Sequence, residues 1–260
     1  TPITRQTDID NLKSAYGIED AWPVVCEPYI QWITEDKYSN GRPEWESAGV
    51  QFVKDVAPYE KMKIRLLNAG HSLLGFSGAL HGYTFIHETV QDKLYANLLR
   101  KFMDKEVTPV LDEVPGIDLN KYKGSLIERF GNQNIKDQVA RICLQSSAKI
   151  PKFLLPTVRD QLKSGGSVLI SALVIAAWCR YAEGIDESGK HYDIEDDMRE
   201  ILHKKALLSH RDNLAFLKIE SIFGDLINSK LFTEAYIDSL NSIYSEGISA
   251  SVKTILKNIN

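Results

Sequence analysis

From about residue 58 onward, apolar side chains recur with the spacing of a helix, and this pattern constrains the fold more than any other feature. In residues 89–111, for example, Leu94, Leu98, Phe102 and Val107 fall on one face of an amphipathic helix. Similar segments follow at residues 121–130, 135–146, 153–163, 167–182, 194–208, 214–228, 233–245 and 249–259. The sequence therefore predicts a mainly α, multi-helix fold.

The first fifty residues differ from the rest. Residues 22–34 mix β-branched and aromatic side chains with Pro23 and Pro28, which favours short extended segments. The stretch Asn40-Gly41-Arg42-Pro43 is typical of a turn. We expect residues 1–50 to form a strand-containing connector and residues 51–260 to form a helical catalytic and substrate domain.

Composition excludes several functional classes. A net charge of -4 and a pI near 5.9 leave no basic stripe, which argues against a nucleic-acid partner. The longest apolar run, residues 168–179, is too short to span a membrane and predicts a buried core helix. Cys26, Cys143 and Cys179 are widely spaced and form no metal-ligand cluster. We therefore expect free thiols, a reducing cytoplasm and no bound metal.

The spacing K-x4-N-x2-H carries the clearest chemistry. At about 100° per residue, Asn68 lies about 140°, His71 about 80° and Glu60 about 60° from Lys63 around a helix, so all four share one side. A desolvated amine can take a proton from an alcohol, and an amide can donate to the oxygen that gains negative charge. This is the chemistry of a metal-free polyol dehydrogenase, although the spacing alone also fits a solvated helix face.

A family resemblance supports the chemical interpretation. The run from Phe52 to Ser72 resembles the signature of the long-chain mannitol dehydrogenase family, which also includes arabinitol dehydrogenases and the reductases of fructuronate and tagaturonate. The similarity covers roughly residues 1–210. Further matching elements are Glu27-Pro28, Gln31-Trp32, Gly41-Arg42-Pro43, Arg129-Phe130, Asn132, Asp137, Arg141-Ile142, Lys149-Ile150-Pro151, Phe153 and Pro156. The resemblance implies a helical C-terminal domain similar to the 6-phosphogluconate dehydrogenase C-terminal-like fold.

The resemblance also implies roles for individual residues. Lys63 is expected to be the general base, Asn68 a donor to the oxyanion, and His71 a hydrogen-bond partner of substrate hydroxyls. Arg141 and Lys149 are expected to bind hydroxyls remote from the reacting carbon.

Two positions leave alternatives open. Glu60 either relays the proton from Lys63 to solvent or is an exposed carboxylate that favours the helix N-terminus. Relatives often carry an acidic residue and a glycine where this chain has Gln145-Ser146, and this departure bears on substrate preference.

The resemblance implies a cofactor, NAD or NADP, bound by an N-terminal Rossmann-type domain. No G-x-G-x-x-G motif is present here, and Gly165-Gly166 follows a helix-like segment, so it indicates a turn. We expect the chain to be the C-terminal portion of a longer enzyme, with the Rossmann domain as its partner. The fragment alone is expected to be inactive and to bind the cofactor weakly.

The leading hypothesis is the catalytic domain of an NAD(P)-dependent mannitol-type 2-dehydrogenase, which interconverts a sugar alcohol and its ketose. A hexuronate reductase of the same family fits equally, because Arg141 and Lys149 would also suit a carboxylate. A non-catalytic helical interaction module is the third alternative. The intact Lys63, Asn68 and His71 weigh against it, because unpaired buried polar groups cost free energy.

Overall fold

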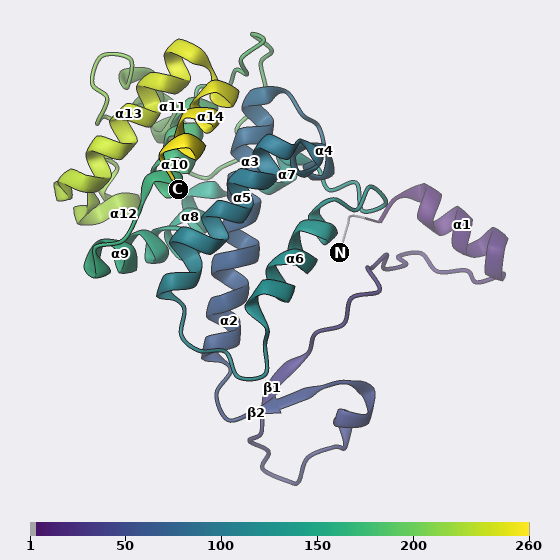
Figure 1. Cartoon of the computed structure of the whole chain (residues 1–260). Coiled ribbons are helices and arrows are strands. Elements are labelled where there is room, and N and C mark those ends of the chain that lie inside the picture. The colour runs from purple at the N-terminus through teal and green to yellow at the C-terminus, as the bar shows by residue number, and fades with distance from the viewer. Residues whose placement is uncertain (1–3, 260) are drawn as a thin grey trace.

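The computed structural model describes residues 4–259, which form a helical body and an N-terminal arm that extends away from it (Figure 1). The arm contains α1 (Gln6–Tyr16), β1 (Ile33–Glu35), η1 (Trp45–Ala48) and β2 (Gln51–Val53). The two strands are parallel. The boundary expected after residue 50 falls just before β2. It therefore separates β2 from β1, although the two strands pair with each other within the arm.

The sequence did not predict helix α1. Its N-terminus is closed by the Asp8 carboxylate, which accepts from the backbone N–H of Arg5 at 2.8 Å, and its C-terminus by Gly17 in the left-handed conformation. No side chain of α1 is buried. Ile9, Leu12 and Tyr16 recur with helical spacing, so a short periodic pattern is present in this segment, although none of these side chains is buried.

The body is built around one continuous helix. It consists of α2 (Ala57–Lys63), η2 (Ile64–Asn68) and α3 (Ala69–His81). Pro58 lies in its first turn, where a missing N–H costs least. The middle part, η2, is a π-helical turn in which the N–H of Ala69 donates to the carbonyl of Ile64, five residues earlier.

The remaining helices pack on this helix or on one another, and the prediction of a mainly α fold is confirmed (Figure 1). They are α4 (Ile86–Gln91), α5 (Lys93–Lys101), η3 (Phe102–Val107), η4 (Thr108–Val110), α6 (Leu119–Phe130), α7 (Val139–Cys143), α8 (Ser146–Phe153), α9 (Leu155–Ser164), α10 (Leu169–Tyr181), α11 (Arg199–Leu208), α12 (Glu220–Phe223), η5 (Gly224–Asn228), α13 (Lys230–Glu246) and α14 (Ile248–Asn258).

Two of the predicted helices are interrupted by a local change of backbone conformation, and a third, the segment 214–228, consists of a turn followed by the short helices α12 and η5. The segment 89–111 breaks at Asp92, which has an extended backbone and caps α5 by accepting from the N–H of Leu94 at 2.8 Å. The segment 135–146 shortens to α7, which begins after the extended Gln138 and ends before Leu144, whose ψ of 141° is not helical; Gln145 then takes a left-handed conformation with φ of 51°. In both cases a local backbone preference ends a helix within a continuous apolar pattern.

Helix α10 forms the centre of the core, where it packs against α3 and α13. All ten residues from Ile170 to Cys179 are buried, as the apolar run predicted. Trp178 stands edge-on to Phe216, with ring centroids 5.1 Å apart. No helix between residues 4 and 259 is long and apolar enough to cross a membrane.

A buried carboxylate connects the π turn η3 to α10. Glu106 accepts from the backbone N–H groups of Ile170 at 2.6 Å and Ser171 at 2.8 Å, and from the hydroxyl of Ser171 at 2.5 Å. Burial raises the pKa of Glu106 to about 7, although these donors oppose the shift. The carboxylate thus satisfies donors in the first turn of α10 that would otherwise be unpaired.

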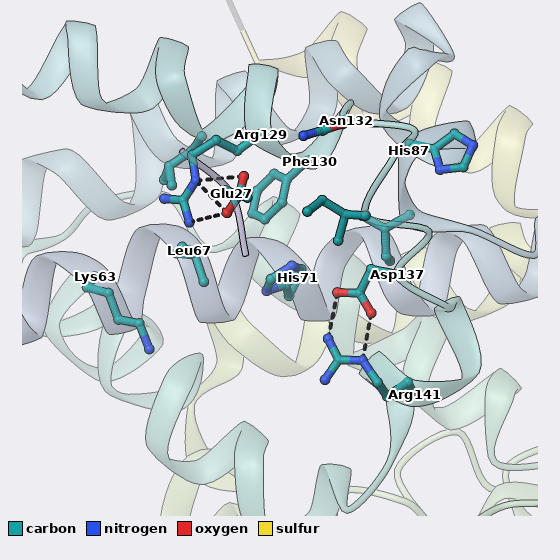
Figure 2. Close-up of a pocket in the computed structure, with 13 residues that line it drawn as sticks. Glu27, Lys63, Leu67, His71, His87, Arg129, Phe130, Asn132, Asp137 and Arg141 are labelled. Carbon is teal, nitrogen blue, oxygen red and sulfur yellow. Dashed lines mark hydrogen bonds and ion pairs between the residues drawn. The ribbon is translucent and has the colours of Figure 1, made fainter. Parts of the chain in front are cut away.

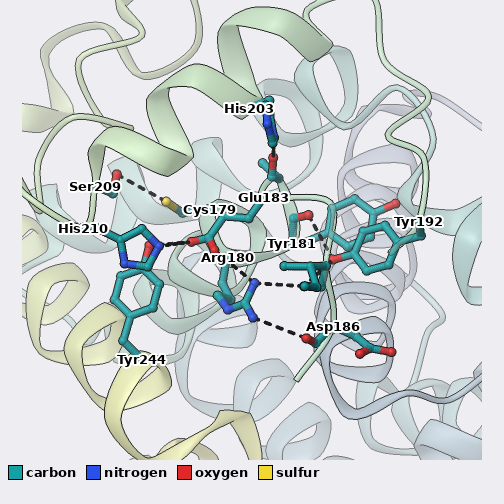
Figure 3. A network of polar contacts seen from close by, with 12 residues as sticks. Cys179, Arg180, Tyr181, Glu183, Asp186, Tyr192, His203, Ser209, His210 and Tyr244 are labelled. Carbon is teal, nitrogen blue, oxygen red and sulfur yellow. Dashed lines mark hydrogen bonds and ion pairs between the residues drawn. The ribbon is translucent and has the colours of Figure 1, made fainter. Parts of the chain in front are cut away.

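A polar cluster holds the other end of α10 (Figure 3). The nearly buried Glu183 carboxylate pairs with Arg180 at 3.1 Å and with His210 at 3.2 Å, and accepts from the hydroxyl of Tyr244 at 2.7 Å. Arg180 also donates to the carbonyl of Ile185 at 2.8 Å. These contacts join α10 and the loop after it to α13.

Candidate active site

A pocket of about 260 Å³ lies between the central helix, α6 and the arm (Figure 2). Lys63, Leu67 and His71 follow one another along the central helix and line one side of it. The full lining is Glu27, Lys63, Leu67, His71, Ile86, His87, Leu126, Arg129, Phe130, Asn132, Ile135, Asp137 and Arg141.

The π turn η2 sets the relative direction of the motif side chains. A π turn holds one more residue than an α turn, so His71 lies roughly 20° from Lys63 around the axis and not about 80°. The two side chains therefore share one face more closely than an unbroken α-helix would allow. π turns of this kind are frequent at functional sites.

His71 is partly buried in the wall of the pocket. Its ring packs on Phe130, with centroids 4.5 Å apart. Desolvation lowers the pKa of His71 to about 4, and the cations Arg141 and Lys63 act in the same direction while Asp137 opposes them. The imidazole is therefore neutral near pH 7, with one nitrogen able to donate and the other able to accept.

Lys63 also lines the pocket, and its side chain is exposed. Among residues 4–259 it makes no hydrogen bond or ion pair, so its amine is free to meet a ligand. Glu60 lies one turn earlier, is exposed, and is not part of the lining. Asn68 is partly buried and is not part of the lining either; its carbonyl accepts from the Ser72 hydroxyl at 3.4 Å.

The two cations of the second cluster are placed differently. Arg141 lines the pocket, and its guanidinium holds Asp137 by two hydrogen bonds of 2.6 Å. Lys149 lies beyond the break at Gln145, where its amine donates to the carbonyl of Ile142 at 3.1 Å. Burial lowers the pKa of Lys149. Of this cluster, the structure brings Arg141 into the pocket with Lys63 and His71.

Sequence reasoning gave no role to the pair Glu27 and Arg129. The Arg129 guanidinium holds the Glu27 carboxylate at 2.9 and 3.2 Å, and lies 3.9 Å from the centre of the Tyr29 ring. Both charged residues belong to elements that match the family, but their separation of 102 positions in the sequence hid their contact. This pair fastens the arm to α6 at the edge of the pocket.

His87 also lines the pocket and escaped sequence reasoning. Its ring stacks on Phe85, and its buried Nδ1 has no hydrogen-bond partner in the described part of the chain. Because His87 is a single histidine outside the motif, the sequence did not indicate that it lies in the pocket.

Comparison with known proteins identifies the family of this chain. A family model described as the mannitol dehydrogenase C-terminal domain matches residues 55–244. This chain belongs to the mannitol dehydrogenase family. The match includes Lys63, His71 and Arg141 of the pocket and confirms the family predicted from the motif.

Similar full-length proteins are mannitol dehydrogenases. The chain is 44% identical over 261 residues to mannitol dehydrogenase DSF1 of Saccharomyces cerevisiae, and 43% identical over 264 residues to a mannitol 2-dehydrogenase of Aspergillus fumigatus. In each case all of this chain is matched, but only 52% of the relative. The chain thus spans about half the length of the curated relatives it matches.

Solved structures agree with this assignment. Pseudomonas fluorescens mannitol 2-dehydrogenase, solved as a ternary complex with NAD and D-mannitol, superimposes with a TM-score of 0.90 at 45% identity, covering 99% of this chain and 52% of that one. A D-sorbitol dehydrogenase in substrate-free form gives a TM-score of 0.87 at 31% identity, covering 97% of this chain and 52% of that one. The fold is therefore that of the C-terminal half of a polyol dehydrogenase.

Proposed function

We propose that this chain is the substrate-binding and catalytic half of an NAD(P)-dependent, metal-independent polyol 2-dehydrogenase that interconverts a mannitol-type sugar alcohol and its ketose. The observation that carries the proposal is the alignment of Lys63 and His71 by the π turn on one wall of a pocket that Arg141 closes. The solved relative with NAD and D-mannitol supports this substrate class.

In the oxidation direction, Lys63 takes the proton of the secondary hydroxyl. Asn68, which follows on the same helix, turns its amide toward the oxygen as negative charge develops. His71, neutral because of its low pKa, donates to one neighbouring hydroxyl and accepts from another. Arg141 binds hydroxyls farther along the chain of the sugar. The nicotinamide cofactor supplies the hydride acceptor when it is bound.

Lys149 and Glu60 have supporting roles in this proposal. Lys149 lies behind Arg141 and reaches the substrate through a change of rotamer from its contact with the Ile142 carbonyl. Glu60, exposed one turn before Lys63, relays the proton to solvent.

The cofactor does not fit this half of the enzyme. Residues 4–259 contain a single two-stranded sheet of three-residue strands, with no βαβ unit to hold a dinucleotide. We therefore assign NAD or NADP to the N-terminal half of the longer protein. It follows that the isolated chain is inactive and binds neither cofactor tightly.

The arm is proposed as the contact surface for that half. Large apolar side chains are exposed along it, among them Tyr16, Trp22 and Ile30, each at least 73% exposed. Exposed apolar surface of this extent marks an interaction site. Docking of the N-terminal half would cover these side chains and would enclose the exposed Lys63.

The location follows from the thiols. Cys26, Cys143 and Cys179 are all unpaired. We assign the protein to a reducing compartment, the cytoplasm.

The deciding experiment follows cofactor oxidation by the full-length protein with fructose, fructuronate and tagaturonate supplied separately. We expect fructose to be reduced at an unchanged rate after dialysis against EDTA. Lys63→Ala should lower kcat by roughly 10²–10⁴-fold. Lys61→Ala, two residues away and paired with Asp112 at 2.9 Å, is the matched control and should keep the rate. Failure to reduce fructose, or full activity of Lys63→Ala, would refute the proposal.

A further inference from the structure

The charges of the pocket are nearly balanced before any substrate binds. Its lining contains three cations, Lys63, Arg129 and Arg141, and two carboxylates, Glu27 and Asp137. Each arginine is held bidentately by one carboxylate. Lys63 is the cation without a partner among residues 4–259, and it must be neutral to accept a proton. For oxidation of the polyol the pocket therefore carries no net formal charge, with histidines counted as neutral, whereas for reduction of the ketose Lys63 carries the proton that it donates and is the one cation not balanced by a carboxylate of the lining.

The pair Asp137 and Arg141 concerns the substrate most directly. Two of the five N–H groups of Arg141 point to Asp137, whose side chain is only 16% exposed. The remaining N–H groups can donate to hydroxyl oxygens. A substrate carboxylate at the same place would have to share one guanidinium with a fixed carboxylate, and solvent would screen only part of their repulsion, because the Arg141 side chain is 39% exposed and the Asp137 side chain 16%.

Resting on the proposed function, we infer that Asp137 is a specificity-determining residue, which neutralises Arg141 and so makes the pocket select uncharged polyols over sugar acids. The hexuronate reductase hypothesis needs the opposite, a cation in the pocket whose charge remains available. An arginine at this position therefore suits an uncharged polyol when a protein carboxylate already pairs with it. It suits a sugar acid when it has no such partner.

The test measures binding and turnover separately in the full-length enzyme. Calorimetry gives Kd for D-mannitol and for D-mannonate, which is mannitol with one end oxidised to a carboxylate. Steady-state kinetics gives kcat/KM for fructose and fructuronate. Wild type should favour the uncharged ligand in both pairs. Asp137→Asn should shift both ratios roughly tenfold toward the acid, while Asp137→Glu should restore the wild-type ratio.

Two controls separate Asp137 from general charge effects. Asp225→Asn removes an exposed carboxylate paired with Arg159 far from the pocket, and should change neither ratio. Glu27→Gln removes the other pocket carboxylate and should change the ratios less than Asp137→Asn. An equal shift in Glu27→Gln would overturn the assignment to Asp137.

Every outcome is decisive. If wild type binds mannonate as well as mannitol, or if Asp137→Asn leaves both ratios unchanged, the inference is wrong. The wild-type comparison decides even if a variant does not fold. If wild type binds the polyol selectively but turns over no ketose, the proposed function fails and the selectivity still stands.

Discussion

At the scale of single residues, the charge that the pocket offers to a ligand depends on which of its charged side chains already form ion pairs within the protein. The sequence predicted Lys63 and His71 as site residues from the K-x4-N-x2-H motif, and Arg141 from a separate element that resembles the family. It could not predict the pairing of Arg129 with Glu27, because periodicity reports on one element at a time. It also could not predict the ion pair between Asp137 and Arg141, since an i, i+4 pair in a sequence is equally typical of a solvated helix surface, and in the structure Asp137 precedes α7.

The low pKa of His71 makes stability depend on pH. Because this pKa falls from 6.5 to about 4 on folding, the unfolded state binds the proton first as pH decreases. The free energy of unfolding should thus decline between about pH 6.5 and 4, by at most about 3 kcal/mol. The Tm of His71→Gln should decrease less between pH 7 and pH 5 than the Tm of the wild type. His191→Gln, at an exposed histidine, should behave as wild type, and an unchanged pH profile in His71→Gln would contradict this account.

At the scale of elements, helix positions followed from the sequence and helix interruptions did not. An apolar stripe survives a single widened turn, so the pattern predicted helices through both η2 and η3 without revealing either π turn. The small residues were more informative. Gly70, Gly75 and Gly78 lie where helices approach closely, and a methyl group at any of them would press on a neighbouring helix.

Gly75 sets the distance between α3 and the helix that carries Arg141. A Cβ there would lie 2.9 Å from Cγ2 of Ile142 and 3.2 Å from Sγ of Cys143. Gly75→Ala should therefore destabilise the fold by about 1–3 kcal/mol in denaturant titration and raise KM for the polyol as α7 shifts. Gly124→Ala is the matched control within α6, where a Cβ meets nothing within 4 Å and alanine should stabilise by up to about 1 kcal/mol. Equal effects of the two variants would refute the packing argument.

At the scale of the whole molecule, the arm is the part least determined by its own sequence pattern. Its short strands were anticipated, but α1 was not, and its exposed apolar side chains have no core to define their partners. Contacts with the body include the Glu27–Arg129 pair and the Tyr29 ring beneath it. The position of the arm therefore depends on these polar contacts and on Ile33 and Val53, which pack against the core.

Removing these contacts should loosen the arm and spare the body. Glu27→Gln with Tyr29→Ala removes an ion pair and a cation–π contact, which together contribute about 1–2 kcal/mol. Hydrogen exchange should quicken in residues 27–35 and stay unchanged in α10. Glu46→Gln, which breaks an exposed ion pair with Arg42 within the arm, should leave the exchange of residues 27–35 as in wild type. Slow exchange in the double variant would show that other contacts hold the arm.

The widened turn between Lys63 and His71 has a consequence for finding this site in other proteins. Eight residues separate the two side chains here because the turn absorbs one of them. A protein that presents the same pair on an unbroken α-helix must place them seven residues apart, as K-x6-H. A helical-wheel search for K-x7-H would therefore discard true counterparts, and a natural deletion of one residue within Ile64–Asn68 would preserve the alignment of base and imidazole.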